Sequence, residues 1–411
     1  MRNKPEVLAP ANSLEVLKTA VEYGADAVYI GGEMYGLRAK AKNFSAEDMK
    51  KGIAYAHERG KKVYVTANIT AHNRDLEGVR AYFHELKEIR PDALIISDPG
   101  VFTIAKEVCP EIDIHISTQS NNVNYMTFRF WKEQGATRVV TARELSLEEI
   151  GDIRKNIPDD FEIETFVHGA MCISYSGRCL LSHYFTGRDA NLGACTHPCR
   201  WKYYIMEEKR PGEFLPVEEN ERGTYIFNSK DLCMIEHIPE LVNAGIDSFK
   251  IEGRMKTALY VATVARTYRK AIDDYLEDQK KYEANMPWYR DQISNCTYRQ
   301  FTTGFYFGKP GDESQIYDSN TYIKEYTYLG IIGGIKDGMY RIEQRNKFSV
   351  GETVEIMKPD GQNVEVTVEK IIDEDGQEQE SAPHPKQVLY VALSGEASVY
   401  DILRRQEDVT E

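Results

Sequence analysis

The stretch VLAPANSLEVLKTAVEYGADAVYIGG, residues 7–32, joins two short apolar runs through a segment with helical spacing. Ser13 stands where the helix is expected to begin, and a serine oxygen there can accept a hydrogen bond from a free backbone N–H. Gly24 stands at the expected end, where glycine commonly terminates a helix. Residues 7–32 are therefore predicted to form a strand, a helix and a second strand.

The same unit recurs through the first 255 residues, where β-branched runs alternate with amphipathic helical segments. Strands are predicted at residues 6–11, 27–32, 62–69, 93–98, 113–119, 137–142, 162–170 and 248–253. Eight strand–helix units in one domain favour an α/β fold, a (β/α)8 TIM-like barrel, and a doubly wound open sheet is the alternative. The active site of such a barrel lies at the carboxyl ends of its strands.

Three regions are expected along the chain. The barrel is predicted at residues 1–285, with a long cysteine-bearing insertion after its seventh strand, and a Tyr-rich connector follows at residues 286–320. Long loops in compact domains are commonly functional or disordered. From residue 321 to 405 short alternating strands separated by Gly and Asp-Gly turns predict a small all-β barrel domain.

The composition predicts a cytoplasmic protein without a membrane partner. The sequence has no run of about 18 apolar residues that could span a bilayer. Its first residues lack the apolar stretch of a secretory signal. Hydrophobic residues at 42% and charged residues at 28% are typical of globular proteins.

The net charge of −14 is unfavourable for nucleic-acid binding, because affinity for phosphate backbones comes chiefly from Lys and Arg, and no DNA partner is expected. The charge is uneven, since residues 321–411 contain 10 Lys plus Arg against 18 Asp plus Glu. Cations near the expected barrel rim are Arg38, Lys40, Lys42, Arg178, Arg188, Arg200, Lys202, Arg254 and Lys256. Aromatic residues that could stack an unpaired base are Tyr35, Tyr175, Tyr184 and Trp201. We expect a basic rim on an acidic protein, and an ordinary solvated face is the alternative.

Four cysteines gather within 28 residues, in the spacing Cys172-x6-Cys179-x15-Cys195-x3-Cys199, and Cys233 follows. Reduced cytosolic thiols argue against disulfides. Thiolates bind zinc or iron-sulfur clusters, usually four to a site. Because Cys172 follows the seventh strand, the pattern predicts a metal site at the barrel mouth. A structural zinc, or cysteines that are merely buried apolar residues, are the alternatives.

The predicted eighth strand and its loop carry Lys250, Glu252 and Arg254 at alternate positions. Lys250 and Glu252 are candidate catalytic residues. Arg254 is a candidate for binding an anionic co-substrate, because a guanidinium can hold a carboxylate through two hydrogen bonds. The alternative is a buried ion-pair lattice that closes the barrel.

Further candidates lie on or near other strand ends. His168, four residues before Cys172, and His115 are candidates for proton transfer, although a single histidine in a strand is more often a core residue. Asn68 and Gln119 end the third and fifth predicted strands. The remaining candidates for substrate binding are Tyr175, Arg178 and Trp201.

Common peptidase motifs are missing from the sequence. It contains neither the H-E-x-x-H of a metalloprotease nor the G-x-S-x-G of a serine hydrolase. A cysteine protease pairing a thiol with His168 or His197 would not explain why four thiols gather. A non-catalytic RNA-binding module with a structural metal is a third class.

Three segments resemble the collagenase-like peptidase family U32: ETFVHGAMCISYSGRCLLSHY (164–184), residues 7–32, and SFKIEGRMK (248–256). GACTHPCRW (193–201) and the two-part organisation resemble the branch of prephenate-dependent tRNA uridine hydroxylation proteins. That resemblance implies oxygen-independent formation of 5-hydroxyuridine at the wobble position of tRNA. It also implies prephenate as co-substrate and a 4Fe-4S cluster on cysteines.

Related cluster-binding proteins do not all have a Cys-x3-Cys pair, whereas this sequence has one at Cys195 and Cys199. The resemblance therefore assigns the cluster to Cys172, Cys179, Cys195 and Cys199, with Cys233 as the alternate for Cys199. The expected partners are tRNA and prephenate. A collagenase-like peptidase, or a hydroxylase acting on another RNA or on an aromatic substrate, is the alternative function.

Overall fold

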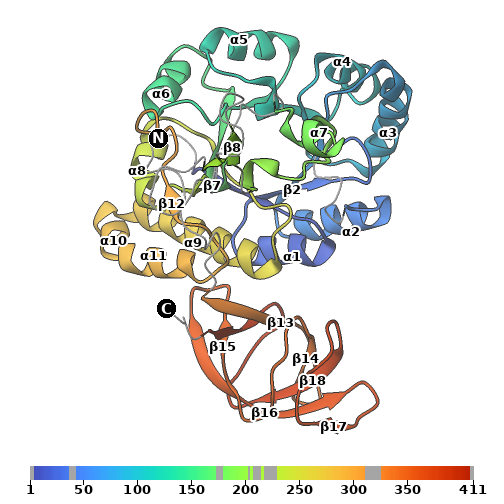
Figure 1. Ribbon diagram of the computed structural model, residues 1–411, viewed down its shortest axis with the longest axis vertical. Helices are drawn as coiled ribbons and strands as arrows, with labels where there is room; N and C mark the ends of the chain where they lie inside the picture. Colours follow the sequence, from blue (N-terminus) through green and yellow to red (C-terminus); the bar gives the residue numbers. More distant parts are fainter. Residues whose placement is uncertain are drawn as a thin grey trace.

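The computed structural model describes residues 4–36, 43–172, 179–201, 204–206, 214–216, 229–310 and 325–407. Eight parallel strands form a closed barrel (Figure 1): β1 (Glu6–Pro10), β2 (Ala27–Gly31), β3 (Lys62–Ala67), β4 (Ala93–Ile96), β5 (Asp113–Ile116), β6 (Arg138–Val140), β7 (Glu162–Ala170) and β11 (Ser248–Ile251). Each pairs with the next, and β11 pairs with both β7 and β1, which closes the ring. The predicted (β/α)8 barrel is confirmed.

Helices surround the barrel: α1 (Leu14–Glu22), α2 (Ala46–His57), α3 (Leu76–Ile89), α4 (Pro99–Val108), α5 (Tyr125–Gln134), α6 (Leu147–Lys155), α8 (Ile238–Asn243) and α9 (Ala258–Glu277). Ser13 caps α1 as predicted, accepting from the backbone N–H of Val16 at 3.3 Å. Apolar side chains of strands and helices form a large core between the two layers. Within the described ranges, no helix combines the length and apolar character needed to cross a membrane.

Shorter elements interrupt and extend the barrel. After β7 come α7 (Leu181–Thr186), the 3-10 helix η4 (Pro198–Arg200), and the antiparallel pair β8 (Tyr204–Met206) and β9 (Phe214–Pro216). Strand β10 (Asp231–Cys233) pairs antiparallel with β7, and β12 (Phe301–Thr302) pairs with β10. Helices α10 (Gln279–Ala284) and α11 (Met286–Ser294) precede β12. The described part of the predicted connector thus contains α11 and a strand of the barrel sheet.

The second domain is all-β, as predicted. Its strands are β13 (Tyr326–Lys336), β14 (Met339–Glu343), β15 (Thr353–Met357), β16 (Asn363–Asp373), β17 (Glu378–Gln379), β18 (Val388–Leu393) and β19 (Ile402–Gln406). They pair in the order β15-β19-β13-β14-β18-β16-β17, and β15 also pairs with β16. The domain has its own buried core, which includes Leu329, Ile356 and Val391.

The two domains pack through α1 and α9 (Figure 1). Tyr23 at the end of α1 donates from its hydroxyl to the carbonyl of Met357 at 2.6 Å. Arg266 on α9 donates to the carbonyl of Lys358 at 2.7 Å. The side chains of Met357 and Ile402 belong to the same buried cluster as the barrel core. This contact holds the β domain against the barrel.

Candidate functional site

A buried ion-pair network fills the barrel interior. Glu164 on β7 is completely buried and accepts from Lys250 Nζ at 2.5 Å and from Arg138 Nη1 at 3.1 Å. Arg138 also pairs with Glu6 on β1 at 2.6 Å. Alternating strand residues point inward, which brings these charges from the four strands β1, β6, β7 and β11 together. Lys250 is thus held in an ion pair inside the barrel.

His115 on β5 is buried in the same interior. Its ring lies 4.6 Å from the ring of Tyr64, centroid to centroid. Burial, together with the charges of Arg138 and Lys250, lowers the pKa of His115 well below its usual value. The imidazole is therefore uncharged at neutral pH, and its Nδ1 has no hydrogen-bond partner among the residues that the structure describes.

Arg254 lies at the barrel mouth, just beyond the carboxyl end of β11. Its guanidinium donates to Asn43 Oδ1 at 2.8 Å and to Thr66 Oγ1 at 3.3 Å. The Nη2 atom lies so close to Gly31 that a Cβ there would be 2.0 Å away. Glycine at position 31 therefore leaves the space that Arg254 occupies, and Arg254 reaches across the mouth from β11 to β2 and β3.

The structure brings the predicted pair Asn68 and Gln119 into direct contact. Asn68 Nδ2 donates to Gln119 Oε1 at 2.7 Å, and the hydroxyl of Ser117 donates to the same oxygen at 3.1 Å. The Gln119 Nε2 atom is buried and has no partner in the described part of the chain. A buried donor without an acceptor is costly, so this amide is suited to a ligand carbonyl or carboxylate at the mouth.

His168 and Cys233 lie behind the barrel wall, against α9. The pairing of β7 with β11 shifts register between Lys250 and Ile251, so that His168 lies opposite Ile251. The His168 ring packs 5.6 Å from Tyr268 and 5.8 Å from Phe301, centroid to centroid. Burial lowers the pKa of His168 to about 4, which leaves it uncharged at neutral pH.

Cys233 faces His168 across the β7–β10 pair, and its Sγ lies 4.0 Å from the hydroxyl of Tyr268. Burial raises the pKa of the Cys233 thiol to about 12. Glu252 follows β11, and its backbone N–H donates to the carbonyl of His168 at 2.8 Å. The structure therefore separates His168 and Cys233 from the polar groups of the mouth.

Three of the four clustered cysteines lie around α7. Cys179 precedes this helix, whereas Cys195 and Cys199 follow it. The buried Ser182 hydroxyl accepts from the backbone N–H of Thr196 at 3.0 Å and lies 3.1 Å from Thr196 Oγ1. We call the contact between Ser182 and Thr196 the hydroxyl clasp. It holds the loop of Cys195 against α7.

Cys172 is exposed, whereas Cys179, Cys195 and Cys199 are half-buried. Within the described ranges, no three His, Cys, Asp or Glu side chains are gathered as a metal site would require. The segment 173–178 that joins Cys172 to Cys179 lies outside those ranges. The four thiols thus match an iron-sulfur cluster in donor chemistry, but the structure does not show them around one point.

An exposed aromatic group stands beside the cysteines. Tyr184 and Phe185 on α7 have ring centroids 5.1 Å apart, and Trp201 lies 6.3 Å from Phe185. All three side chains are exposed. The predicted residues whose structure lies outside the described ranges are Arg38, Lys40, Lys42, Tyr175, Arg178 and Lys202.

Arg143 and Glu144, in the loop after β6, are mouth residues that the sequence patterns did not single out. Arg143 Nη1 donates to the carbonyl of Ala170 at 2.9 Å, two residues before Cys172. Its guanidinium lies 5.2 Å from the ring centroid of Phe166. Burial raises the pKa of Glu144, and Arg143 partly opposes this shift. Their position in a loop after a barrel strand could have identified them, because the active site of such a barrel is built from the loops that follow all eight strands.

A closed (β/α)8 barrel with polar side chains at the carboxyl ends of its strands defines a TIM-barrel protein with an enzyme-like mouth. The model of Peptidase family U32 matches residues 12–316. The model of the Peptidase family U32 C-terminal domain matches residues 324–404. The chain therefore belongs to peptidase family U32.

Several relatives match most of the chain. It is 41% identical over 404 residues to tRNA hydroxylation protein P1 of Bacillus subtilis, covering 98% of this chain and 95% of that protein. It is 40% identical over 424 residues to tRNA hydroxylation protein P of Escherichia coli, covering 92% of each. A 23S rRNA 5-hydroxycytidine synthase of Escherichia coli is 36% identical over 274 residues, covering 67% of this chain and 40% of that protein.

Proposed function

We propose that this protein hydroxylates RNA, and specifically that it forms 5-hydroxyuridine at the wobble position of tRNA. The observation that carries the proposal is the 41% identity with tRNA hydroxylation protein P1 over 98% of the chain. The relative that acts on ribosomal RNA supports the broader class of RNA hydroxylation. The exposed rings of Tyr184, Phe185 and Trp201 beside the cysteine segment are suited to stacking unpaired bases.

A 4Fe-4S cluster on Cys172, Cys179, Cys195 and Cys199 is part of this proposal. Support comes from four thiols within 28 residues and from the hydroxyl clasp that anchors the loop of Cys195. When bound, such a cluster supplies one-electron transfer. Cys233 lies behind the barrel wall, and this position disfavours it as the fourth ligand.

Prephenate as a required co-substrate is the third part of the proposal. Arg254 presents a guanidinium at the mouth, where it could bind a carboxylate. The unpartnered amide of Gln119 could donate to a carboxylate or to a pyrimidine carbonyl. Arg143 adds a second guanidinium near Cys172. The candidate substrate groups are therefore anions and carbonyls, which these donors can hold.

Analysis of tRNA nucleosides in a deletion strain tests the activity. Mass spectrometry should show the loss of 5-hydroxyuridine derivatives at the wobble position, and the intact gene should restore them. Unchanged derivatives in a strain without a paralogue would contradict hydroxylation. The same comparison in a strain that cannot make prephenate tests the co-substrate. Peptide cleavage by purified protein that survives loss of iron would favour the peptidase alternative.

A further inference from the structure

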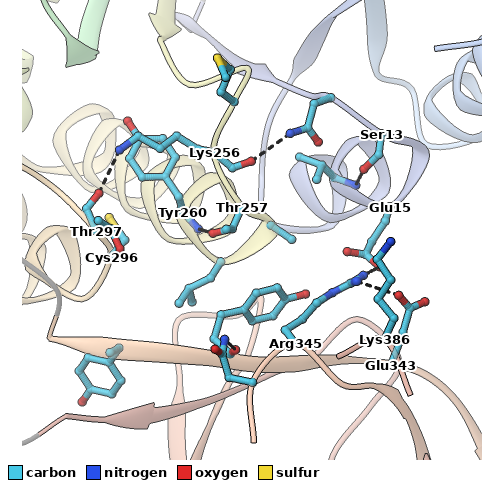
Figure 2. Close-up of a pocket in the computed structure, with 18 residues that line it drawn as sticks. Ser13, Glu15, Lys256, Thr257, Tyr260, Cys296, Thr297, Glu343, Arg345 and Lys386 are labelled. Atoms are coloured by element: carbon cyan, nitrogen blue, oxygen red, sulfur yellow. Dashed lines mark hydrogen bonds and ion pairs between the residues drawn. The ribbon is translucent and has the colours of Figure 1, made fainter. Parts of the chain in front are cut away.

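A cavity of about 670 Å³ lies where the barrel meets the β domain (Figure 2). The barrel contributes the first turns of α1 and α9, and the β domain contributes β13, the turn after β14, and Lys386. The first turns of α1 and α9 follow β1 and β11, so the cavity opens on the same side of the barrel as the mouth. Its volume lies in the range of small-molecule sites.

The charged side chains of the cavity wall leave a net positive charge. The three cations are Lys256, Arg345 and Lys386, and the two carboxylates are Glu15 and Glu343. Arg345 binds both carboxylates, at 2.6 Å to Glu15 and 2.7 Å to Glu343. Lys386 forms no ion pair with any residue that the structure describes. Figure 2 shows Arg345 and Lys386 extending from the β domain toward α1.

Hydrogen-bond donors without acceptors face the same space. Thr257 caps α9 by accepting from the N–H of Tyr260, but the N–H groups of Ala258 and Leu259 donate to no described residue. Helix amino termini favour anions for this reason. Tyr328, a cavity residue only 8% exposed, has its hydroxyl beside the Arg345 guanidinium, which can only donate, so the hydroxyl proton has no acceptor in the described part of the chain. The missing partner in each case is an acceptor.

The remaining wall is mixed, with the polar residues Asn12, Ser13, Thr297 and Asn346 and an apolar part. Val16, Met255 and Leu259 line the cavity, and the Tyr260 ring lies beside them. Met255 is 52% exposed, so its side chain is accessible to a ligand in the cavity. An apolar wall opposite a set of donors matches a molecule with an apolar body and an anionic head.

We propose that the cavity between the barrel and the β domain binds a small organic anion with an apolar body and a carboxylate or phosphate head. The α9 amides, Tyr328 and Lys386 hold the head, and Met255 and Leu259 contact the body. This inference does not rest on RNA hydroxylation. It gives the β domain a ligand-binding role at the edge of the barrel mouth.

Isothermal titration calorimetry of the full chain tests the site with phenylacetate, phenyl phosphate and the uncharged analogue 2-phenylethanol. At least one of the two anions should bind, and 2-phenylethanol should not. The preferred anion identifies the head group as carboxylate or phosphate. Lys386→Ala and Tyr328→Phe should each weaken binding about tenfold, the usual scale for losing a hydrogen bond to a charged group.

Lys347→Ala is the matched control, because Lys347 is an exposed lysine of the same domain that does not line the cavity. The Lys347→Ala variant should bind the anion with the same affinity as the unchanged protein. Circular dichroism should show that all three variants are folded. Absence of binding by both anions would overturn the proposal. Equal binding of 2-phenylethanol, or unchanged affinity in both Lys386→Ala and Tyr328→Phe, would overturn it as well.

Discussion

At the scale of single residues, the fourth ligand of the proposed cluster can be inferred from the side of the barrel wall on which each thiol lies. Cys233 is the last residue of β10 and lies near Tyr268 of α9, whereas Cys199 belongs to the segment around α7. Cys199→Ser should therefore lower the iron content per chain strongly, whereas Cys233→Ser should leave it near the original value. Iron analysis and absorbance near 400 nm after anaerobic purification measure both. The reverse result would assign Cys233 as ligand, and stoichiometric zinc in a colourless protein would exclude the cluster.

The position of Arg254 can be changed without mutating Arg254. Gly31→Ala would place a methyl group 2.0 Å from Nη2, and the flexible guanidinium must move because it is the nearest group. We expect folded protein with hydroxylation lowered about tenfold, the scale of losing one charge-assisted hydrogen bond. Gly151→Ala on α6 is the control, since nothing lies within 4 Å of its added methyl. Full activity in Gly31→Ala would show that the anchored position of Arg254 is not needed.

His115 gives a pH-dependent prediction. Its pKa is depressed in the folded protein from the usual 6.5, because burial and nearby cations disfavour the charged ring. The unfolded chain thus binds more protons below pH 6.5, so the free energy of unfolding should fall as pH drops below that value. His115→Phe retains the ring beside Tyr64 and should reduce this acid destabilisation. Urea denaturation of both proteins from pH 7.5 to 5 measures the free energy of unfolding, and an equal acid loss in His115→Phe would contradict the prediction. A folded His115→Phe variant without activity would separately indicate a catalytic role for His115.

Much of the mouth could be predicted from the sequence because carboxyl ends of barrel strands converge. Asn68 and Gln119 were expected there and are in contact. His168 illustrates what alternation misses, since a register shift between β7 and β11 directs it toward α9. Arg143 has no motif around it, so only the fold shows that it reaches Ala170. The catalytic and binding roles of these residues stay predictions.

At the scale of elements, periodicity located every barrel strand but not every strand end. The strand predicted at 113–119 ends at Ile116, because Thr118–Ser120 forms a 3-10 turn that tertiary contacts stabilise. Thr118 donates to the carbonyl of Thr141, which lies beyond β6. This contact joins residues 23 positions apart, so a local sequence pattern cannot predict it.

The hydroxyl clasp provides a test of the cysteine segment as a structural unit. Ser182→Ala removes the acceptor for the Thr196 N–H and should free the loop that carries Cys195. Limited proteolysis should cut within residues 179–201 faster, and iron content should fall. Thr103→Ala, which removes an exposed hydroxyl on α4, should change neither. Unchanged proteolysis in Ser182→Ala would mean that the loop is held by other contacts.

At the scale of the whole molecule, the barrel and the β domain share a buried interface and should unfold together. Tyr23→Phe leaves the buried carbonyl of Met357 without its donor, at a cost of about 1–3 kcal/mol in the free energy of unfolding. The three tryptophans, Trp131, Trp201 and Trp288, lie outside the β domain, and Trp288 packs near Gly361 at the interface. Fluorescence therefore follows the barrel and the interface, while far-ultraviolet circular dichroism follows both domains. The two signals should give urea transitions with the same midpoint. In Tyr23→Phe both midpoints should move to a lower urea concentration. Tyr184→Phe, whose residue is 82% exposed, should leave the midpoint unchanged. Two separated transitions in the original protein would show that the domains unfold independently and that the shared interface does not couple them.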